Sequence, residues 1–220
     1  MDKSLGVTRF FYGFLNHLSK ERHKIASLQL SGRLEDYLVH EFIYYVYSSS
    51  NGSRFAFTNM GKANEQKVDI VIASGSYEKK SIKAMIEAKY LRNRHRFSKS
   101  NAEDEITTTL RSLKKQLHKF EESKHAGLTV KLSSKRQDIY GLVFASYVGF
   151  SQDETRDDKE RFFSKCLNEA LKLGFRYHDL HKPYWRTAFE DEKVKALKIN
   201  LSISLRAGLW RLSSPEQSSA

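Results

Sequence analysis

Hydrophobic residues recur every three or four positions in four stretches of the chain. In the first stretch, Phe11, Phe14, Leu15 and Leu18 share one side of a helix. The same spacing predicts helical structure over residues 7–30, as one long helix or two short ones, and over 33–47, 104–122 and 157–173. The dipeptide Ser31-Gly32 and the polar run 48–52 interrupt the pattern and predict breaks between these elements.

Five other stretches have the pattern of strands. A short one covers 54–58, and two more, 67–73 and 82–90, flank the turn-like segment 74–81. Residues 139–150 are almost continuously apolar, which is typical of a strand covered on both faces. Strict alternation over 196–205 predicts a strand with one buried face. Between residues 33 and 150 the predicted order is therefore helix, three strands, helix, strand, a mixed α/β arrangement.

Two of these predicted strands carry charges where apolar residues are expected. Asp69 lies in KVDIVIA, and Glu87 and Lys89 lie in KAMIEAKY, where alternation sends both to the same face. If the two strands form an antiparallel hairpin, placing Asp69 opposite Glu87 centres the turn in segment 74–81 and pairs Val71 with Met85. The three charged side chains then converge on one patch, whereas a one-residue slip would separate them.

Two carboxylates held together repel each other unless a cation lies between them or one is protonated. Oxygen ligands on a rigid strand suit Mg²⁺ or Mn²⁺, and the carbonyl oxygen of Ala88 could add a further ligand. A lysine beside such an ion can orient a water molecule or stabilise charge on a phosphate. The combination indicates phosphodiester hydrolysis, and an ion pair at a sheet edge is the alternative interpretation.

Asp69, then seventeen intervening residues, then Glu87-Ala88-Lys89 resembles the signature of the PD-(D/E)xK nuclease superfamily, which includes restriction endonucleases and Holliday-junction resolvases. The superfamily core has the order read above for residues 33–150. The resemblance implies that Asp69 and Glu87 bind the metal and that Lys89 assists the attacking water. Val68 stands where the name of the motif has proline, a position that varies within the superfamily.

Such nucleases often take a further acid from the helix that precedes the sheet. The candidates are Glu35, Asp36 and Glu41. At about 100° per residue, Glu35 falls within the apolar face, Asp36 points away and Glu41 lies at the border. Glu35 is therefore the preferred third acid and Glu41 the second choice. An acid favoured by the helix dipole is the alternative explanation for Glu35.

Basic residues surround the predicted site. The segment after Lys89 is rich in arginine, and its basic residues alternate with Tyr90 and Phe97, which suits a phosphate backbone. The following helix carries more cations, and its Gln116 resembles a glutamine found in some branches of the superfamily. A solvated helix face is the alternative for any single lysine there. The expected nucleic-acid contacts are Arg92, Arg94, Arg96, Lys99, Arg111, Lys114, Lys115 and Gln116.

The composition agrees with a polyanionic partner. The 220 residues include 38 Lys and Arg against 26 Asp and Glu, a formal net charge of +12. A single cysteine, Cys166, excludes an internal disulfide and sits in a helical pattern, as a buried thiol would. Without an apolar run that could cross a membrane or act as a signal peptide, we expect a cytoplasmic protein. The pair His178 and His181 lacks the further ligands of a zinc site.

We therefore expect one nuclease domain over 1–212, with a restriction-endonuclease-like core at 33–150, a helical extension at 1–30, an α/β extension at 151–212 and a disordered tail at 213–220. The expected activity is Mg²⁺-dependent (or Mn²⁺-dependent) DNA endonuclease, acting as a homodimer whose interface uses the N-terminal helices or strand 196–205. The alternatives are a catalytically inactive nucleic-acid-binding module, a resolvase or repair nuclease, and an RNA-directed nuclease.

Overall fold

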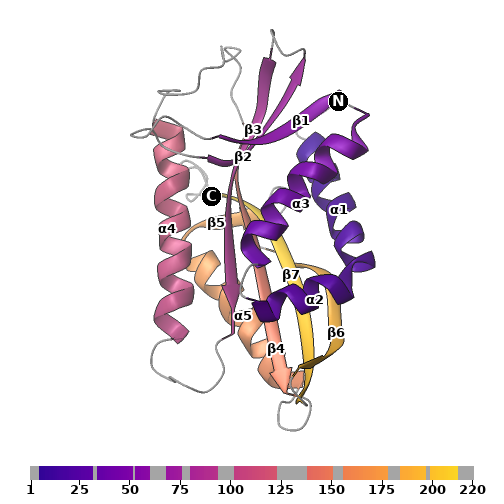
Figure 1. The fold of residues 1–220 in the computed structure, drawn as a ribbon. Coiled ribbons are helices and arrows are strands. Elements are labelled where there is room, and N and C mark those ends of the chain that lie inside the picture. Colours follow the sequence, from indigo (N-terminus) through magenta and orange to yellow (C-terminus); the bar gives the residue numbers. More distant parts are fainter. Residues whose placement is uncertain are drawn as a thin grey trace.

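The described part of the chain forms five helices and seven strands (Figure 1). The computed structural model describes residues 5–31, 34–51, 53–59, 68–75, 80–93, 102–122, 138–150, 156–177, 184–196 and 199–212. The helices are α1 (Leu5–Lys20), α2 (Arg22–Ser31), α3 (Leu34–Ser49), α4 (Ala102–Glu122) and α5 (Arg156–Lys172). The strands are β1 (Arg54–Asn59), β2 (Val68–Gly75), β3 (Lys80–Arg92), β4 (Asp138–Phe150), β5 (Phe175–Tyr177), β6 (Arg186–Ala196) and β7 (Ile199–Leu212).

All seven strands belong to one mixed sheet. Its order is β1-β2-β3-β4-β7-β5, and β6 also pairs with β7. Only β3 and β4 run parallel, and α4 connects them, because parallel neighbours need a long crossover. The segment from α3 to β4 thus has the predicted order of helix, three strands, helix, strand. The fold is a mixed α/β fold.

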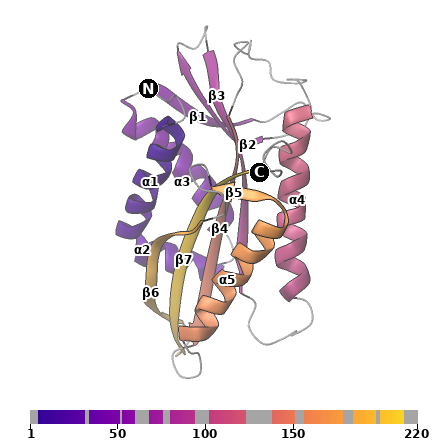
Figure 2. The ribbon, with the colours of Figure 1, turned by 180° about the vertical axis from the view of Figure 1, so that it is seen from behind.

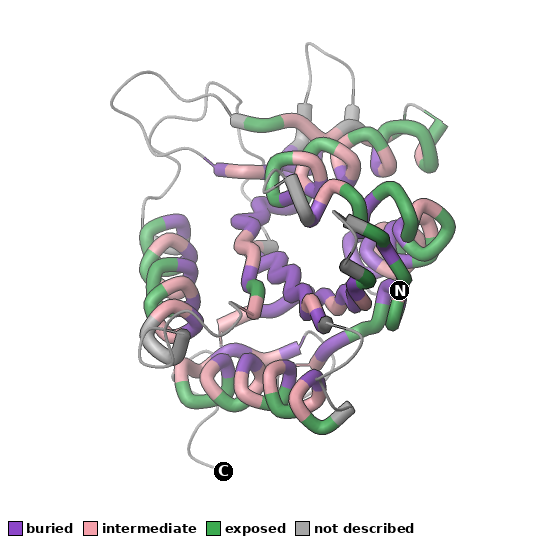
Figure 3. Tube along the Cα trace, turned by 60° about the horizontal axis from the view of Figure 1, so that its bottom comes forward, coloured by how far each residue is buried: buried purple, intermediate pink, exposed green. Residues whose placement is uncertain are grey.

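Helices cover both faces of the sheet. Helices α1, α2 and α3 lie on one side and α4 and α5 on the other, as Figures 1 and 2 show from opposite directions. Alternate strand residues feed the two resulting cores: Ile70 and Ile86 pack with Leu38 of α3, and Val71 and Met85 pack with Leu110 of α4. Buried residues accordingly gather on the strands at the centre, inside the exposed outer faces of the helices (Figure 3).

Strand β4 has the predicted double coverage. Leu142 and Phe144 are buried in the core of α1–α3, and Val143 and Ala145 are buried in the core of α4–α5. Helix α5 contributes Cys166 to the second core, so the expected buried thiol is confirmed.

The prediction of a strand with one buried face at 196–205 is confirmed in part. Residue 196 ends β6 and residues 199–205 form the first half of β7, which pairs with β4, β5 and β6 inside the sheet. Ile203 and Leu205 face the core of α1–α3 as predicted, but Ser204 on the other face is only 1% exposed. The buried hydroxyl of Ser204 is not left without a partner, because it accepts a hydrogen bond from the backbone N–H of Asp191 over 3.0 Å.

Both surfaces expected to form a dimer interface are used within the chain. Strand β7 is central, and the apolar side of α1 packs into the core through Phe11, Phe14 and Leu18, all 0% exposed. These residues are thus buried within the chain's own core, and the homodimer stays a prediction. Among the described residues, no helix is both long and apolar enough to span a membrane.

Candidate active site

The β2–β3 hairpin has the register that the charged residues predicted. Val71 pairs with Met85 and Ile70 with Ile86. A one-residue irregularity follows between Ile72 and Ala73, so that the extra residue, Lys83, lies between the paired positions and the tip of the hairpin. The register on the side of the charges is therefore the one that brings Asp69 and Glu87 together.

Asp69 is anchored to the neighbouring strand. Its Oδ2 accepts a hydrogen bond from the backbone N–H of Ala88 over 2.8 Å. The N–H and C=O of one strand residue point to the same edge, so the carbonyl of Ala88 also faces the side of Asp69. A carboxylate that is otherwise unfavourable in a strand is in this way held beside Glu87.

Glu87 is a buried carboxylate with one oxygen in use. Its side chain is 2% exposed, and Lys89 Nζ donates to Oε1 over 2.7 Å. Its Oε2 is buried and has no hydrogen-bond partner in the part of the chain that the structure describes. Burial raises the pKa of Glu87 to about 7, and the negative charge of Asp69 adds to the effect, which the Lys89 ammonium only partly offsets.

The site lies where β3 extends past the end of β2. Continuing the observed register, Val68, the first residue of β2, stands opposite Ala88. From Lys89 onward the described residues pair β3 only with β4, where Lys89 is opposite Val143. The Lys89 side chain is 19% exposed, so the lysine connects the buried Glu87 to the surface.

Glu35 contributes a third acid to the same region. It lies in the first turn of α3, where the neighbouring protein partly removes water from its carboxyl group and raises its pKa, while the charge of Lys89 lowers that pKa and the charge of Asp69 raises it. These influences place Glu35 near both residues. The prediction that Glu35 lies inside the apolar face of the helix was wrong, because Glu35 is exposed and the buried face consists of Leu34, Leu38, Phe42 and Val46.

The other two acids of α3 are engaged elsewhere or face solvent. Glu41 Oε1 accepts a hydrogen bond from His17 Nε2 of α1 over 2.6 Å. Asp36 is exposed. Glu41 is therefore engaged with α1, and Glu35 as the third acid stays a prediction.

The donor set fits a divalent cation in part. The available oxygens are those of Asp69, the unpartnered Oε2 of Glu87, the carbonyl of Ala88 and the carboxylate of Glu35, all hard ligands of the kind that Mg²⁺ and Mn²⁺ prefer. No group of three or more His, Cys, Asp or Glu side chains among the described residues is arranged to hold a metal ion. Two carboxylates with water molecules and substrate oxygens are nevertheless a common way of binding Mg²⁺.

The structure places some of the predicted nucleic-acid contacts near this site. Arg92, at the end of β3, is exposed, and its charge lowers the pKa of the adjacent Tyr90 while burial raises it. Arg94, Arg96 and Lys99 lie outside the described residues. On α4, Arg111 and Lys115 are exposed, Lys114 is half-buried, and Gln116 has a buried Oε1 without a hydrogen-bond partner in the described part of the chain.

Tyr90 has a structural role beside the candidate site. Its hydroxyl is hydrogen-bonded to Gln29 Oε1 of α2 and to Ser146 Oγ of β4. This arrangement ties α2, β3 and β4 together directly beside Lys89. The sequence contains little sign of this role: Tyr90 stands in a predicted strand directly after Lys89, and nothing marks Gln29 or Ser146 as its partners.

Comparison with known proteins adds no identification: the chain matches no family model, and it has no significant match to a curated protein or a solved structure.

Proposed function

We propose that this protein is a divalent-metal-dependent nuclease of the PD-(D/E)xK type that hydrolyses phosphodiester bonds of DNA. The single observation that carries the proposal is the meeting of Asp69, Glu87 and Lys89 on one patch of the β2–β3 hairpin, with a buried and unpartnered oxygen on Glu87. The order α3-β1-β2-β3-α4-β4 supports a restriction-endonuclease-like core, because it is the order of that superfamily.

Asp69, Glu87 and the Ala88 carbonyl would hold the ion, with Glu35 beside them. The ion, when bound, would polarise the scissile phosphate and make a bound water more acidic. With a pKa of about 7, Glu87 has similar populations of its protonated and ionised forms near pH 7. A positive charge beside it would shift this balance to the ionised form, which is the form that binds metal. Lys89 Nζ, next to Glu87, is placed to orient a water by hydrogen bonding and to offset negative charge that develops on the phosphate.

Plasmid cleavage tests the proposal. Supercoiled plasmid is incubated with the protein in Mg²⁺, Mn²⁺ or EDTA, and nicked and linear products are quantified. We expect metal-dependent cleavage that falls by about a hundredfold or more in Asp69→Asn, Glu87→Gln and Lys89→Ala. Glu41→Gln is the matched control, since this acid of α3 is hydrogen-bonded to His17, and it should cleave like the parent. Cleavage by Glu87→Gln at the parental rate, or none by the parent with either ion, would refute the proposal.

A second candidate is a nucleic-acid-binding module that keeps this fold without catalysis. The observation in its favour is that Lys89 already neutralises Glu87 in an internal ion pair, as in a purely structural site. DNA binding by the parent without cleavage in Mg²⁺ or Mn²⁺ would support the module. Running the cleavage assay on plasmid, branched DNA and RNA separates a site-specific nuclease, a resolvase and an RNA-directed enzyme.

A further inference from the structure

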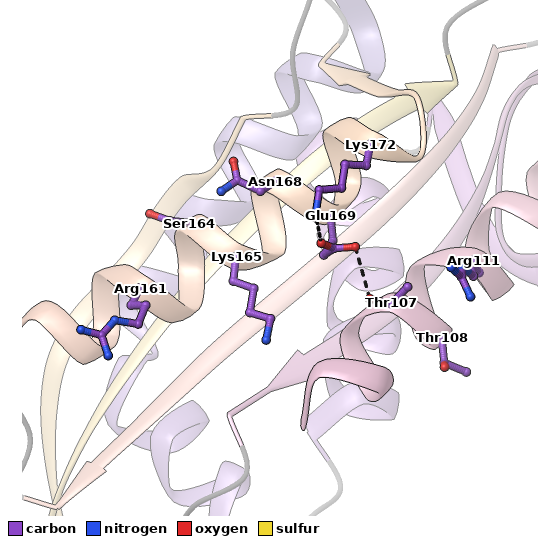
Figure 4. A pocket seen from close by; sticks show the side chains of 9 residues that line it. All are labelled: Thr107, Thr108, Arg111, Arg161, Ser164, Lys165, Asn168, Glu169 and Lys172. Carbon is purple, nitrogen blue, oxygen red and sulfur yellow. Dashed lines mark hydrogen bonds and ion pairs between the residues drawn. The ribbon is translucent and has the colours of Figure 1, made fainter. Parts of the chain in front are cut away.

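A positively charged groove runs between α4 and α5. Its volume is about 870 Å³, and Figure 4 shows residues of both helices along it. Four cations line it: Arg111 from α4, and Arg161, Lys165 and Lys172 from α5. The groove lies on the layer that covers one face of the sheet, away from α1, α2 and α3 (Figures 1 and 2).

The only acid among the lining residues is Glu169, and it is already paired. Lys172 Nζ donates to Glu169 Oε1 over 2.6 Å, and Thr107 Oγ1 donates to Oε2 over 3.3 Å. The hydrogen bond from Lys172 lowers the pKa of Glu169, which keeps that carboxylate ionised and the pair intact. Four cations thus face a single acid among the lining residues, so the lining carries a net positive charge. Arg161 also reaches Asp158, 3.7 Å away, but its side chain is 80% exposed.

The remaining lining is polar and suits a ligand with many acceptor oxygens. Threonine, serine and asparagine side chains lie between the cations, and Lys165 extends from α5 into the space toward α4 (Figure 4). Hydroxyl and amide groups beside arginine and lysine are the usual contacts of a sugar–phosphate backbone. An apolar ligand or peptide would find few apolar surfaces here.

We propose that the α4–α5 groove binds the sugar–phosphate backbone of a nucleic acid, as a second contact surface beside the candidate active site. This inference deepens the proposed function, since it concerns the same class of substrate. The two surfaces belong to the same layer: Glu87 shares its face of β3 with Met85, and Met85 packs in the core beneath α4 and α5. A nucleic-acid strand held in the groove would lengthen the stretch of nucleic acid that the protein contacts beyond the scissile phosphate.

Binding measured without metal tests the groove independently of cleavage. The anisotropy of a fluorescein-labelled 20-base-pair DNA duplex is titrated in EDTA at several salt concentrations. The double variant Arg111→Ala/Lys165→Ala should bind on the order of tenfold more weakly, and the slope of log K against log[salt] should shrink by about 2, one for each lost phosphate contact. The matched control, Lys193→Ala/Lys195→Ala on β6, removes the same charge from exposed positions and should stay within about twofold of the parent.

Equal weakening by both double variants would overturn the proposal, because net charge alone would then explain the binding, and an unchanged groove variant would overturn it as well. If the double variant fails to fold, the exposed Arg111→Gln alone should reduce the slope by about 1. If the parent cleaves no DNA but groove variants lose binding, the proposed nuclease fails and the groove stands. If the parent cleaves DNA and the groove variants bind like the parent, the groove fails and the nuclease stands.

Discussion

Glu87 shows at the residue scale why a charge inside a strand is informative. A carboxylate that is 2% exposed costs free energy, and its ion pair with Lys89 does not restore an ordinary pKa. A hydrophobic residue at this position would pack without that cost. The folded protein therefore carries a local instability that a bound cation would relieve.

This instability predicts a pH dependence for the metal-free protein. The pKa of Glu87 is raised to about 7 in the folded state, so the group favours folding at low pH and loses that contribution as the pH rises from about 4.5 to 7. In EDTA, the free energy of unfolding of Glu87→Gln should gain on that of the parent by on the order of 2 kcal/mol between pH 5 and pH 8. Urea unfolding of both proteins at pH 5 and pH 8 measures this difference in the free energy of unfolding. The same difference at both pH values would show that Glu87 does not titrate in this range.

Cys166 gives a second prediction at this scale. Burial raises the pKa of its thiol to about 12, so almost no thiolate is present near pH 8. A disulfide reagent such as DTNB should leave the folded protein unlabelled and modify one thiol per chain in urea. Rapid labelling of the folded protein would mean that α5 opens easily from the sheet.

Some residues of the candidate site can be predicted from the sequence alone, and others cannot. Asp69, Glu87 and Lys89 stand out because each breaks the pattern of a buried strand. Glu35 does not stand out in this way, because helical periodicity predicts only which side of a helix is buried. The buried side of α3 that the structure shows differs from the side that the sequence predicted. The role of Tyr90 was not predicted, because the distant Gln29 and Ser146, which bind its hydroxyl, leave no local signal.

At the scale of elements, the contact between α4 and β4 depends on a glycine. A Cβ built on Gly141 would lie 2.9 Å from Cδ2 of Leu113, which is fully buried. Gly141 is also the partner of Glu87 in the β3–β4 register. The absence of a side chain at Gly141 thus lets α4 pack closely over the strand beside the candidate site.

The substitution Gly141→Ala should destabilise the protein by about 1–3 kcal/mol, because Leu113 must move in a packed core. Leu113→Val removes one methylene and so makes room for the new methyl group. The double variant should therefore lose less stability than the sum of the losses measured for the two single variants. Thermal and urea unfolding of the parent, both single variants and the double variant provide the cycle. Strict additivity would mean that the two residues do not compete for space.

Strands β5 and β6 were not predicted because their sequence carries little strand signal. The middle of β6 contains the consecutive acids Glu190, Asp191 and Glu192, and Asp191 has a φ of 53°. Tertiary partners make this acceptable: Lys159 Nζ of α5 donates to both carboxylate oxygens of Asp191, at 3.1 and 3.0 Å. Such partners come from distant parts of the chain, so local periodicity does not report them.

At the scale of the whole molecule, the sheet makes the C-terminal part indispensable to the predicted core. Strand β7 pairs with β4 along ten positions, from Gly141–Trp210 to Phe150–Leu201. The order of elements between residues 33 and 150 was predicted correctly, but the sequence did not show that β7 covers the far edge of β4.

A fragment that ends at residue 150 should therefore fail to fold. It would expose the edge of β4 along its length and open both hydrophobic cores, which would favour aggregation. Circular dichroism should show no cooperative thermal transition for residues 1–150, whereas residues 1–212 should unfold cooperatively. A cooperative, soluble 1–150 fragment would show that β7 is an accessory strand.

The irregularity at Lys83 has a consequence for how this hairpin can vary. The extra residue separates the tip of the hairpin from the paired positions that fix Asp69 against Glu87. Changes of length on the tip side of Lys83 should therefore leave the spacing of Asp69 and Glu87 unchanged. The outer part of the hairpin and the candidate site at its base are in this sense independent of each other.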